Sequence, residues 1–145
     1  MPAKPLRILG LDPGFGRLGY GIIERSGREW KVVVAGIIET SPKQTFVKRV
    51  LVLHTELTKL IAKYEPAGAA IEELFFAKNV TTGIKVAEAR GVLILTLAQA
   101  KLPIKELTPL QVKQALTGYG RAEKRQVEFM VSHLLGLKGK KRLKD

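Results

Sequence analysis

The chain has 145 residues, a net charge of +12 and no cysteine. This length suits one domain with a hydrophobic core, and the lack of cysteine excludes disulfides and thiolate metal sites. No apolar stretch reaches the roughly 18 residues of a membrane span, and no signal peptide is evident, so a cytoplasmic protein without a membrane partner is expected. The 25 basic residues against 13 acidic ones favour a nucleic-acid partner, although a generically basic or ribosome-associated protein would show the same balance.

The first predicted strand ends in a carboxylate. The apolar run 8–11 is typical of a strand buried on both faces, and it leads into Asp12 and a turn of proline and glycine at 13–16. Of the 13 acidic residues only Asp12 and Asp145 are aspartates. An acid at the exit of a buried strand can reach a ligand or ion, but an Asp-Pro-Gly turn without chemistry fits this stretch equally well.

Two further strands follow through short connections. Alternating apolar residues predict a strand over Leu18–Glu24, and the turn at Ser26–Gly27 leads into a third strand over Glu29–Glu39. Short connections between successive strands indicate an antiparallel meander. A loop over 40–44 then precedes the first helix.

The next three elements predict a change to parallel pairing. Apolar residues at three- and four-residue steps predict a helix over about Thr45–Tyr64, which Pro66 would end, and Ala67–Glu72 is a short strand of small residues. A strand, a crossover helix and another strand favour parallel pairing with a right-handed connection. Asp12 and Glu72 would then emerge at the same edge of the sheet, where sites in open α/β sheets lie.

A second helix is predicted over about 81–100. It is apolar over a wide arc, which indicates either burial between the sheet and a partner or, as the simpler interpretation, a central helix. Gly91 is expected to permit a close approach of another backbone. A fifth strand is predicted over Leu102–Leu107, with Pro103 indicating a sheet edge or a strand start.

The last third of the chain reads as helical. Thr108 and Gln111 form the pattern of a capping box, with Pro109 in the first helical position. That helix would end at Gly118, and a further helix is predicted over Glu123–Leu135. The resulting fold class is α/β, with a mixed five-stranded sheet flanked by helices and no domain boundary within 1–145.

The two carboxylates at adjacent strand ends favour a metal site. Asp12 and Glu72 would place hard oxygen ligands together, and Mg²⁺ or Mn²⁺ relieves the repulsion between them. Two such ions roughly 4 Å apart can hydrolyse a phosphodiester, although two carboxylates are few for two ions. Glu73 ranks second as a ligand because it would point to the opposite face. His54 and His133 lack ligand spacing and are interpreted as surface or packing residues.

Aromatic and basic residues supply candidate contacts to nucleic acid. Phe75 and Phe76 lie beside Lys78, and one ring is expected in the core while the other can stack on an unpaired base. Lys113 and Lys124 could hold phosphate, but from position alone two solvated lysines are the simpler interpretation.

Taken together, the chain resembles the RuvC-type Holliday junction resolvases of bacteria. Four stretches carry the resemblance in family order and spacing, and they cover nearly the whole chain: I-L-G-L-D-P-G-F-G-R-L-G-Y-G (8–21), A-I-E-E-L-F-F-A-K-N (70–79), A-R-G-V (89–92) and Q-V-K-Q-A-L-T-G-Y-G-R-A-E-K-R-Q-V (111–127). The D-P-G-x-G element alone is weak evidence, whereas the four together are highly specific.

The resemblance implies a fold, a reaction and partners. It implies a ribonuclease H-like domain that works as a homodimer and nicks a four-way DNA junction symmetrically, in recombination and repair, with Mg²⁺ as cofactor. Mn²⁺ is expected to substitute, with two ions per active site. A branch-migration motor complex (RuvA/RuvB type) is the implied protein partner. The alternative is a protein that binds branched DNA without cutting it.

The resemblance also implies roles for individual residues. Asp12, Glu72 and Asp145 match metal-binding catalytic carboxylates, and Lys113 and Lys124 match basic residues that hold the phosphate backbone and support cleavage. The implied DNA contacts are Phe75, Lys78, Lys113, Arg121 and Lys124. Dimer contacts are implied for the helix over 81–100.

The end of the chain departs from the family pattern. The family closes on a helix of the type D-x-x-D-A-L-A, and Asp145 falls where its first acid should be, so the fourth ligand and that helix are missing. A truncated form of a longer protein is expected, with impaired metal binding, and a missing fourth carboxylate is what supports the non-cleaving alternative.

Overall fold

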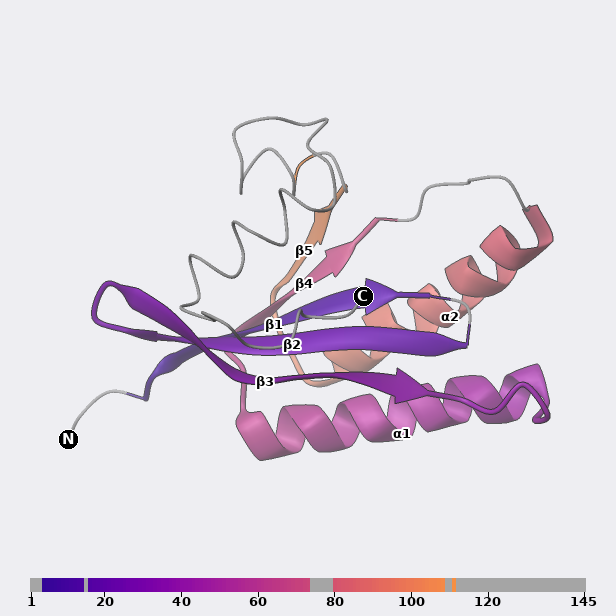
Figure 1. Ribbon diagram of the computed structural model, residues 1–145, viewed down its shortest axis with the longest axis horizontal. Coiled ribbons are helices and arrows are strands. Elements are labelled where there is room, and N and C mark those ends of the chain that lie inside the picture. Colours follow the sequence, from indigo (N-terminus) through magenta and orange to yellow (C-terminus); the bar gives the residue numbers. More distant parts are fainter. Residues whose placement is uncertain (1–3, 15, 74–79, 109–110, 112–145) are drawn as a thin grey trace, which may run out of the picture.

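The computed structural model describes residues 4–14, 16–73, 80–108 and 111. A five-stranded mixed sheet runs through the molecule in the order β3-β2-β1-β4-β5 (Figure 1). Its strands are β1 (Leu6–Pro13), β2 (Arg17–Ser26), β3 (Glu29–Glu39), β4 (Gly68–Glu72) and β5 (Ile104–Leu107). The first three strands are antiparallel, and β4 and β5 continue the sheet in parallel with β1, which confirms the predicted topology.

Two helices, α1 (Phe46–Tyr64) and α2 (Val80–Gln99), cover the same face of the sheet (Figure 1). Leu9 of β1 and Ile71 of β4 point toward this face and are almost fully buried. They pack in one core cluster with Leu57 of α1 and Leu97 of α2, both 0% exposed. The apolar alternation in the strands therefore meets the apolar stripes of both helices, and this packing sets which strand residues face away from the core.

The ends of α1 follow from local hydrogen bonding. The Thr45 hydroxyl accepts from the backbone N–H of Lys48 at 3.3 Å, which is the N-cap arrangement. At the other end Glu65 takes a left-handed conformation with φ of 48° and donates its N–H to the carbonyl of Ile61. The helix thus ends at Tyr64, as predicted, two residues before Pro66.

Two predictions on α2 have different outcomes. The helix buries one face in the core, while Val80, Ile84 and Leu95 are exposed. In the described part of the chain it is therefore not the fully buried, central helix of the simpler interpretation. Gly91 lies on the exposed side, and a Cβ added there would meet no described atom within 4 Å. No described backbone approaches Gly91, so the expected close approach stays a prediction.

The structure confirms the predicted packing role of His54 and the predicted capping box of Thr108 and Gln111. His54 Nδ1 lies 2.8 Å from the hydroxyl of Thr96, which joins α1 to α2 as a packing contact. Thr108 and Gln111 form the predicted capping box, with reciprocal bonds of 3.0 and 2.9 Å. Strand β5 starts directly after Pro103 and lies at the sheet edge, as that proline indicated.

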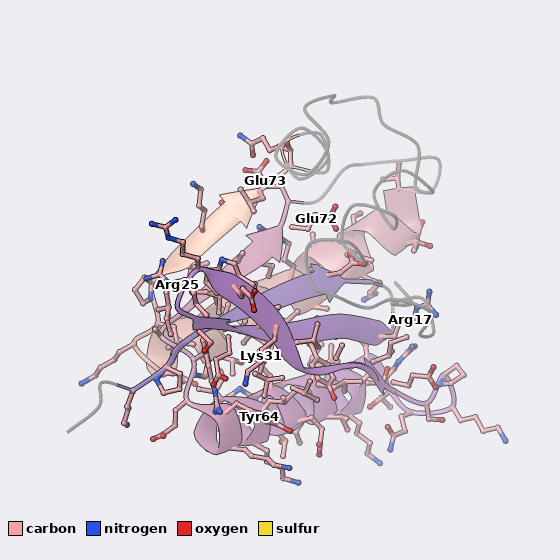
Figure 2. The ribbon with its side chains drawn as sticks, turned by 60° about the vertical axis from the view of Figure 1, so that its left-hand side comes forward. Arg17, Arg25, Lys31, Tyr64, Glu72 and Glu73 are labelled. Carbon is pink, nitrogen blue, oxygen red and sulfur yellow. The ribbon has the colours of Figure 1, made fainter. Side chains whose placement is uncertain are left out.

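An ion-pair network ties the sheet to the end of α1. Glu24 is 8% exposed and accepts from Arg7 Nε at 2.9 Å and pairs with Lys31 Nζ at 3.3 Å. Arg7 also donates to the carbonyl of Tyr64 at the end of α1 (Figure 2, where Lys31 and Tyr64 are labelled). The hydrogen bond from Arg7 is the main cause that lowers the pKa of Glu24 from its ordinary value of 4.5, with a smaller contribution from Lys31 and with burial acting in the opposite direction.

This network predicts a loss of stability in acid. Because the pKa of Glu24 is lower in the folded state, its contribution is present above about pH 4.5 and disappears as the pH falls through the folded value. We expect a double-mutant cycle of Arg7→Met and Glu24→Gln, followed by urea unfolding, to show coupling at neutral pH that shrinks in acid. A coupling free energy that is the same at neutral and acidic pH would contradict this interpretation.

Among the described residues, neither helix is apolar enough over a sufficient length to cross a membrane.

Candidate active site

The ends of β1 and β4 bring two carboxylates together. In the parallel pairing of these strands Leu11 lies opposite Ile71, so Asp12 and Glu72 are the next residues in register. Neighbouring strands lie about 4.8 Å apart, and residues in register point to the same face. Asp12 is part of β1 and pairs with Gly19 of β2, so it lies within the strand and not in the following turn.

Both carboxylates lie on the face of the sheet that α1 and α2 do not cover. Leu11 and Ile71 are 5% and 1% exposed because they point into the core under α1 and α2. Residues alternate along a strand, so Asp12 and Glu72 point the other way. Asp12 is exposed and Glu72 is half-buried, which leaves both carboxylates accessible from that side.

Small strand residues lie beside this pair on the same face of the sheet. Gly19 lies opposite Asp12, and Gly10, two residues earlier in β1, lies between Gly21 of β2 and Ala70 of β4. Side chains this small leave the sheet surface low beside the carboxylates. A large ligand can therefore approach the strand ends without meeting a bulky described side chain from these positions.

Glu73 differs from Glu72, as the strand alternation predicted. Its backbone N–H donates to the carbonyl of Leu107 at 2.7 Å, so the pairing with β5 continues one residue beyond β4. Glu73 is more exposed than Glu72, and the two side chains diverge at the end of β4 (Figure 2). Glu72 is the better placed partner for Asp12.

Basic side chains approach this end of the sheet from other elements. Arg17 begins β2 and is exposed at the same end of the sheet as Glu72 (Figure 2). Arg90 of α2 donates from Nε to the backbone carbonyl of Glu72 at 3.0 Å and pairs with Glu106 of β5 at 2.9 Å. The sequence interpretation assigned neither arginine a role, although Arg90 stands in the quoted A-R-G-V stretch, which was the available signal.

Several predicted site residues lie outside the described residues. They are Phe75, Phe76, Lys78, Lys113, Arg121, Lys124, His133 and Asp145. Their predicted roles stay predictions. Of the three carboxylates predicted to bind metal, the structure describes Asp12 and Glu72, which lie side by side.

The donor set of this pair fits a hard divalent cation. Two carboxylates on adjacent strands offer oxygen ligands, which Mg²⁺ and Mn²⁺ prefer. The described residues contain no group of three or more potential metal ligands, so the two carboxylates form part of a site and not a complete cage. Such a cation typically retains several waters and also takes oxygens from substrate phosphates.

A mixed sheet in this order, with acids at the ends of β1 and β4, defines a ribonuclease H-like α/β protein. Comparison with known proteins identifies the family. The model of the family described as crossover junction endodeoxyribonuclease RuvC matches residues 8–145. The chain belongs to this family of nucleases.

Curated relatives and solved structures agree with the family match. The RuvC protein of Caldicellulosiruptor saccharolyticus is 56% identical over 133 residues, covering 91% of this chain and 80% of the relative. That of Thermosipho melanesiensis is 47% identical and covers 91% and 84%. The structure of Thermus thermophilus RuvC in complex with a Holliday junction substrate has a TM-score of 0.87 at 33% identity, over 94% of this chain and 84% of that one.

A more distant structure supports the fold alone. The yeast mitochondrial Holliday junction resolvase superposes with a TM-score of 0.66 at 16% identity, over 93% of this chain and 63% of that one. The fold is therefore shared by proteins whose sequences differ widely.

Proposed function

We propose that this chain is a structure-selective endonuclease that resolves four-way DNA junctions by symmetric phosphodiester hydrolysis. The observation that carries the proposal is the pair Asp12 and Glu72, in register on adjacent parallel strands, with Asp12 exposed and Glu72 half-buried. Membership of the crossover junction endodeoxyribonuclease family supports it, and so does the likeness to a relative solved with a Holliday junction substrate. The net charge of +12 suits a polyanionic substrate.

The family is one of metal-dependent nucleases, and we propose Mg²⁺ as the ion, with Mn²⁺ able to replace it and two ions per site. Asp12 and Glu72 would hold the metal, together with Asp145. When bound, the metal polarises the scissile phosphate and favours ionisation of the attacking water. The chain's own carboxylates would position it at the ends of β1 and β4, where a phosphate backbone could lie.

A carboxylate pair also bears on the alternative of a non-cleaving binding protein. Two negative charges facing a phosphate backbone weaken DNA binding, so a protein that only binds gains nothing from Asp12 and Glu72. Their retention at in-register positions therefore supports cleavage. Junction binding without cleavage remains a distinct outcome of the experiment below.

Contacts to DNA are proposed for residues that the resemblance assigns. Phe75 would stack on bases near the exchange point, Lys78 and Arg121 would contact DNA, and Lys113 and Lys124 would hold the phosphate backbone and support cleavage. Arg17, exposed at the same end of the sheet, is suitably placed to add to the local positive charge.

We propose a homodimer in the cytoplasm that acts with a branch-migration motor complex. The exposed apolar side chains of α1 and α2 support the dimer, because burying such residues against a second copy removes them from water. They are Val47, Leu51, Val80, Ile84 and Leu95. The motor partner rests on the family resemblance.

The test is cleavage of a synthetic four-way junction beside a linear duplex of the same sequence, with and without Mg²⁺. Paired symmetric nicks in the junction, dependent on Mg²⁺, are expected. Junction-selective binding without nicks would favour the binding-protein alternative, and equal affinity for junction and duplex would overturn the proposed substrate.

A further inference from the structure

Each strand end that carries a candidate carboxylate is tied to a helix by an arginine. At the end of β4 the tie is direct, because Arg90 donates to the backbone carbonyl of Glu72. Beside Asp12 the tie runs through Thr40, which bonds the turn after β1 and accepts from Arg49 of α1. The two arginines come from different helices.

Arg90 is held in a defined orientation. Its side chain is 14% exposed, and while Nε donates to Glu72, Nη2 pairs with Glu106 at 2.9 Å. Two bonds from one planar guanidinium fix both its position and its rotation. The contact therefore links α2, β4 and β5 at the residue that carries the second carboxylate.

Thr40 is the central residue of the other tie. Its hydroxyl donates to the carbonyl of Gly16 at 2.6 Å and accepts from Arg49 Nε at 2.9 Å, and its backbone N–H donates to the same carbonyl at 2.9 Å. Thr40 is 9% exposed, so these bonds are shielded from water. Both the donor and an acceptor site of the hydroxyl are used.

The glycine at this turn is required by the contact. Gly16 has φ of +80°, which favours glycine, and a Cβ built there would collide with Arg49 Nη2. The guanidinium therefore packs directly against the backbone of the turn. A bond from Gly14 N–H to the carbonyl of Arg17 at 2.9 Å closes the same turn, which begins immediately after Asp12 and Pro13.

We propose that Arg90 and the Thr40–Arg49 pair are positioning residues that set the relative placement of the Asp12 and Glu72 carboxylates. This inference rests on the proposed metal-dependent function. Two like charges on adjacent strands repel, and Mg²⁺ requires near-ideal octahedral geometry, so the backbone that carries the ligands must resist spreading. Both ties end on backbone carbonyls, those of Glu72 and Gly16, so the proposed role is one of orientation and not of coordination.

The experiment measures Mn²⁺ binding in the absence of DNA, through the electron paramagnetic resonance signal of free Mn²⁺. Thr40→Val removes the hydroxyl with little change in shape, and Arg90→Lys keeps the charge but loses the planar fork. We expect each to weaken Mn²⁺ binding by about 10- to 100-fold, as replacement of outer-shell partners does. The Mg²⁺ concentration for half-maximal junction cleavage should rise in parallel, whereas metal-free junction binding should stay unchanged.

Matched variants separate positioning from general damage to the fold. Thr40→Ser keeps the hydroxyl and should restore Mn²⁺ affinity. Thr58→Val removes a hydroxyl that bonds only within α1, to the carbonyl of His54, and Arg28→Lys makes the arginine exchange in the distant β2–β3 hairpin. Both should bind Mn²⁺ like the unmodified chain, and urea unfolding of every variant identifies any that fails to fold.

The outcomes distinguish this inference from the function on which it rests. If Asp12→Asn loses Mn²⁺ binding while folded Thr40→Val and Arg90→Lys retain it within about twofold, the positioning role is wrong and the metal site stands. If Thr40→Val does not fold, Arg49→Lys takes its place with the same expectations. Mn²⁺ binding unaffected by Asp12→Asn, or absent from the unmodified chain, would overturn both the proposed site and its positioning residues.

Discussion

The Asp12→Asn variant is expected to lose junction cleavage and to keep junction binding. Asp12 is exposed and in register with Glu72, so the amide removes the charge of a proposed metal ligand without a change in size. Loss of an outer-shell partner already lowers activity by up to about 100-fold, so loss of a direct ligand should exceed that. Binding should be equal or tighter, because a negative charge facing the phosphates is removed.

Single-turnover cleavage and a gel-shift titration in the absence of divalent ions test the two halves of this expectation. Glu29→Gln is the matched control, since it makes the same change in net charge on an exposed residue of the β2–β3 hairpin, at the opposite end of the sheet. It should cleave like the unmodified chain. Weaker junction binding by a folded Asp12→Asn protein would contradict the placement of this carboxylate opposite the DNA.

The Leu57→Ala variant is expected to lose about 2–5 kcal/mol of unfolding free energy. Leu57 is 0% exposed, lies in the middle of α1 and packs in the core cluster beneath the sheet. Truncation removes apolar contacts and leaves a cavity that the sheet cannot fill by collapsing, because its strands are hydrogen-bonded to each other.

Urea unfolding followed by circular dichroism measures this loss. Leu57→Met conserves volume and should cost less than about 1.5 kcal/mol. Thr55→Ala, on the exposed side of the same helix, should change stability by no more than about 0.5 kcal/mol. A loss for Leu57→Ala no larger than that for Thr55→Ala would show that α1 is not packed as described.

Most elements could be predicted because their signals are local. The strand over Glu29–Glu39 has the predicted bounds, and α1 and β5 differ from the expected ranges by one or two residues at a start. Apolar periodicity, a threonine cap and proline act over a few residues, so they are visible without the tertiary structure. The end of α1 at Tyr64 was predicted from Pro66, whereas the left-handed cap at Glu65 was not, because glutamate carries no strong signal for that conformation.

The site was partly predictable for the same reason. Asp12 and Glu72 each follow a run of apolar residues, and the parallel connection between those runs brings their ends together. Arg90 and Thr40 were missed because each bonds a backbone carbonyl far away in the chain, 18 and 24 residues distant. Arg49 was missed because it reaches the same turn only through the hydroxyl of Thr40. Nothing in a side chain's identity tells which distant carbonyl it will meet.

By itself the sequence determined the fold class, the mixed five-stranded sheet and the two strands that end in carboxylates, since these depend on periodicity and connection rules. The tertiary structure alone decided that Asp12 lies within β1, that Gly91 faces outward, and that α1 and α2 both pack on the face opposite the carboxylates. It also decided that arginines of both helices hold the strand ends. Packing and hydrogen bonds between residues far apart in the chain set these features, and they exist only once the chain has folded.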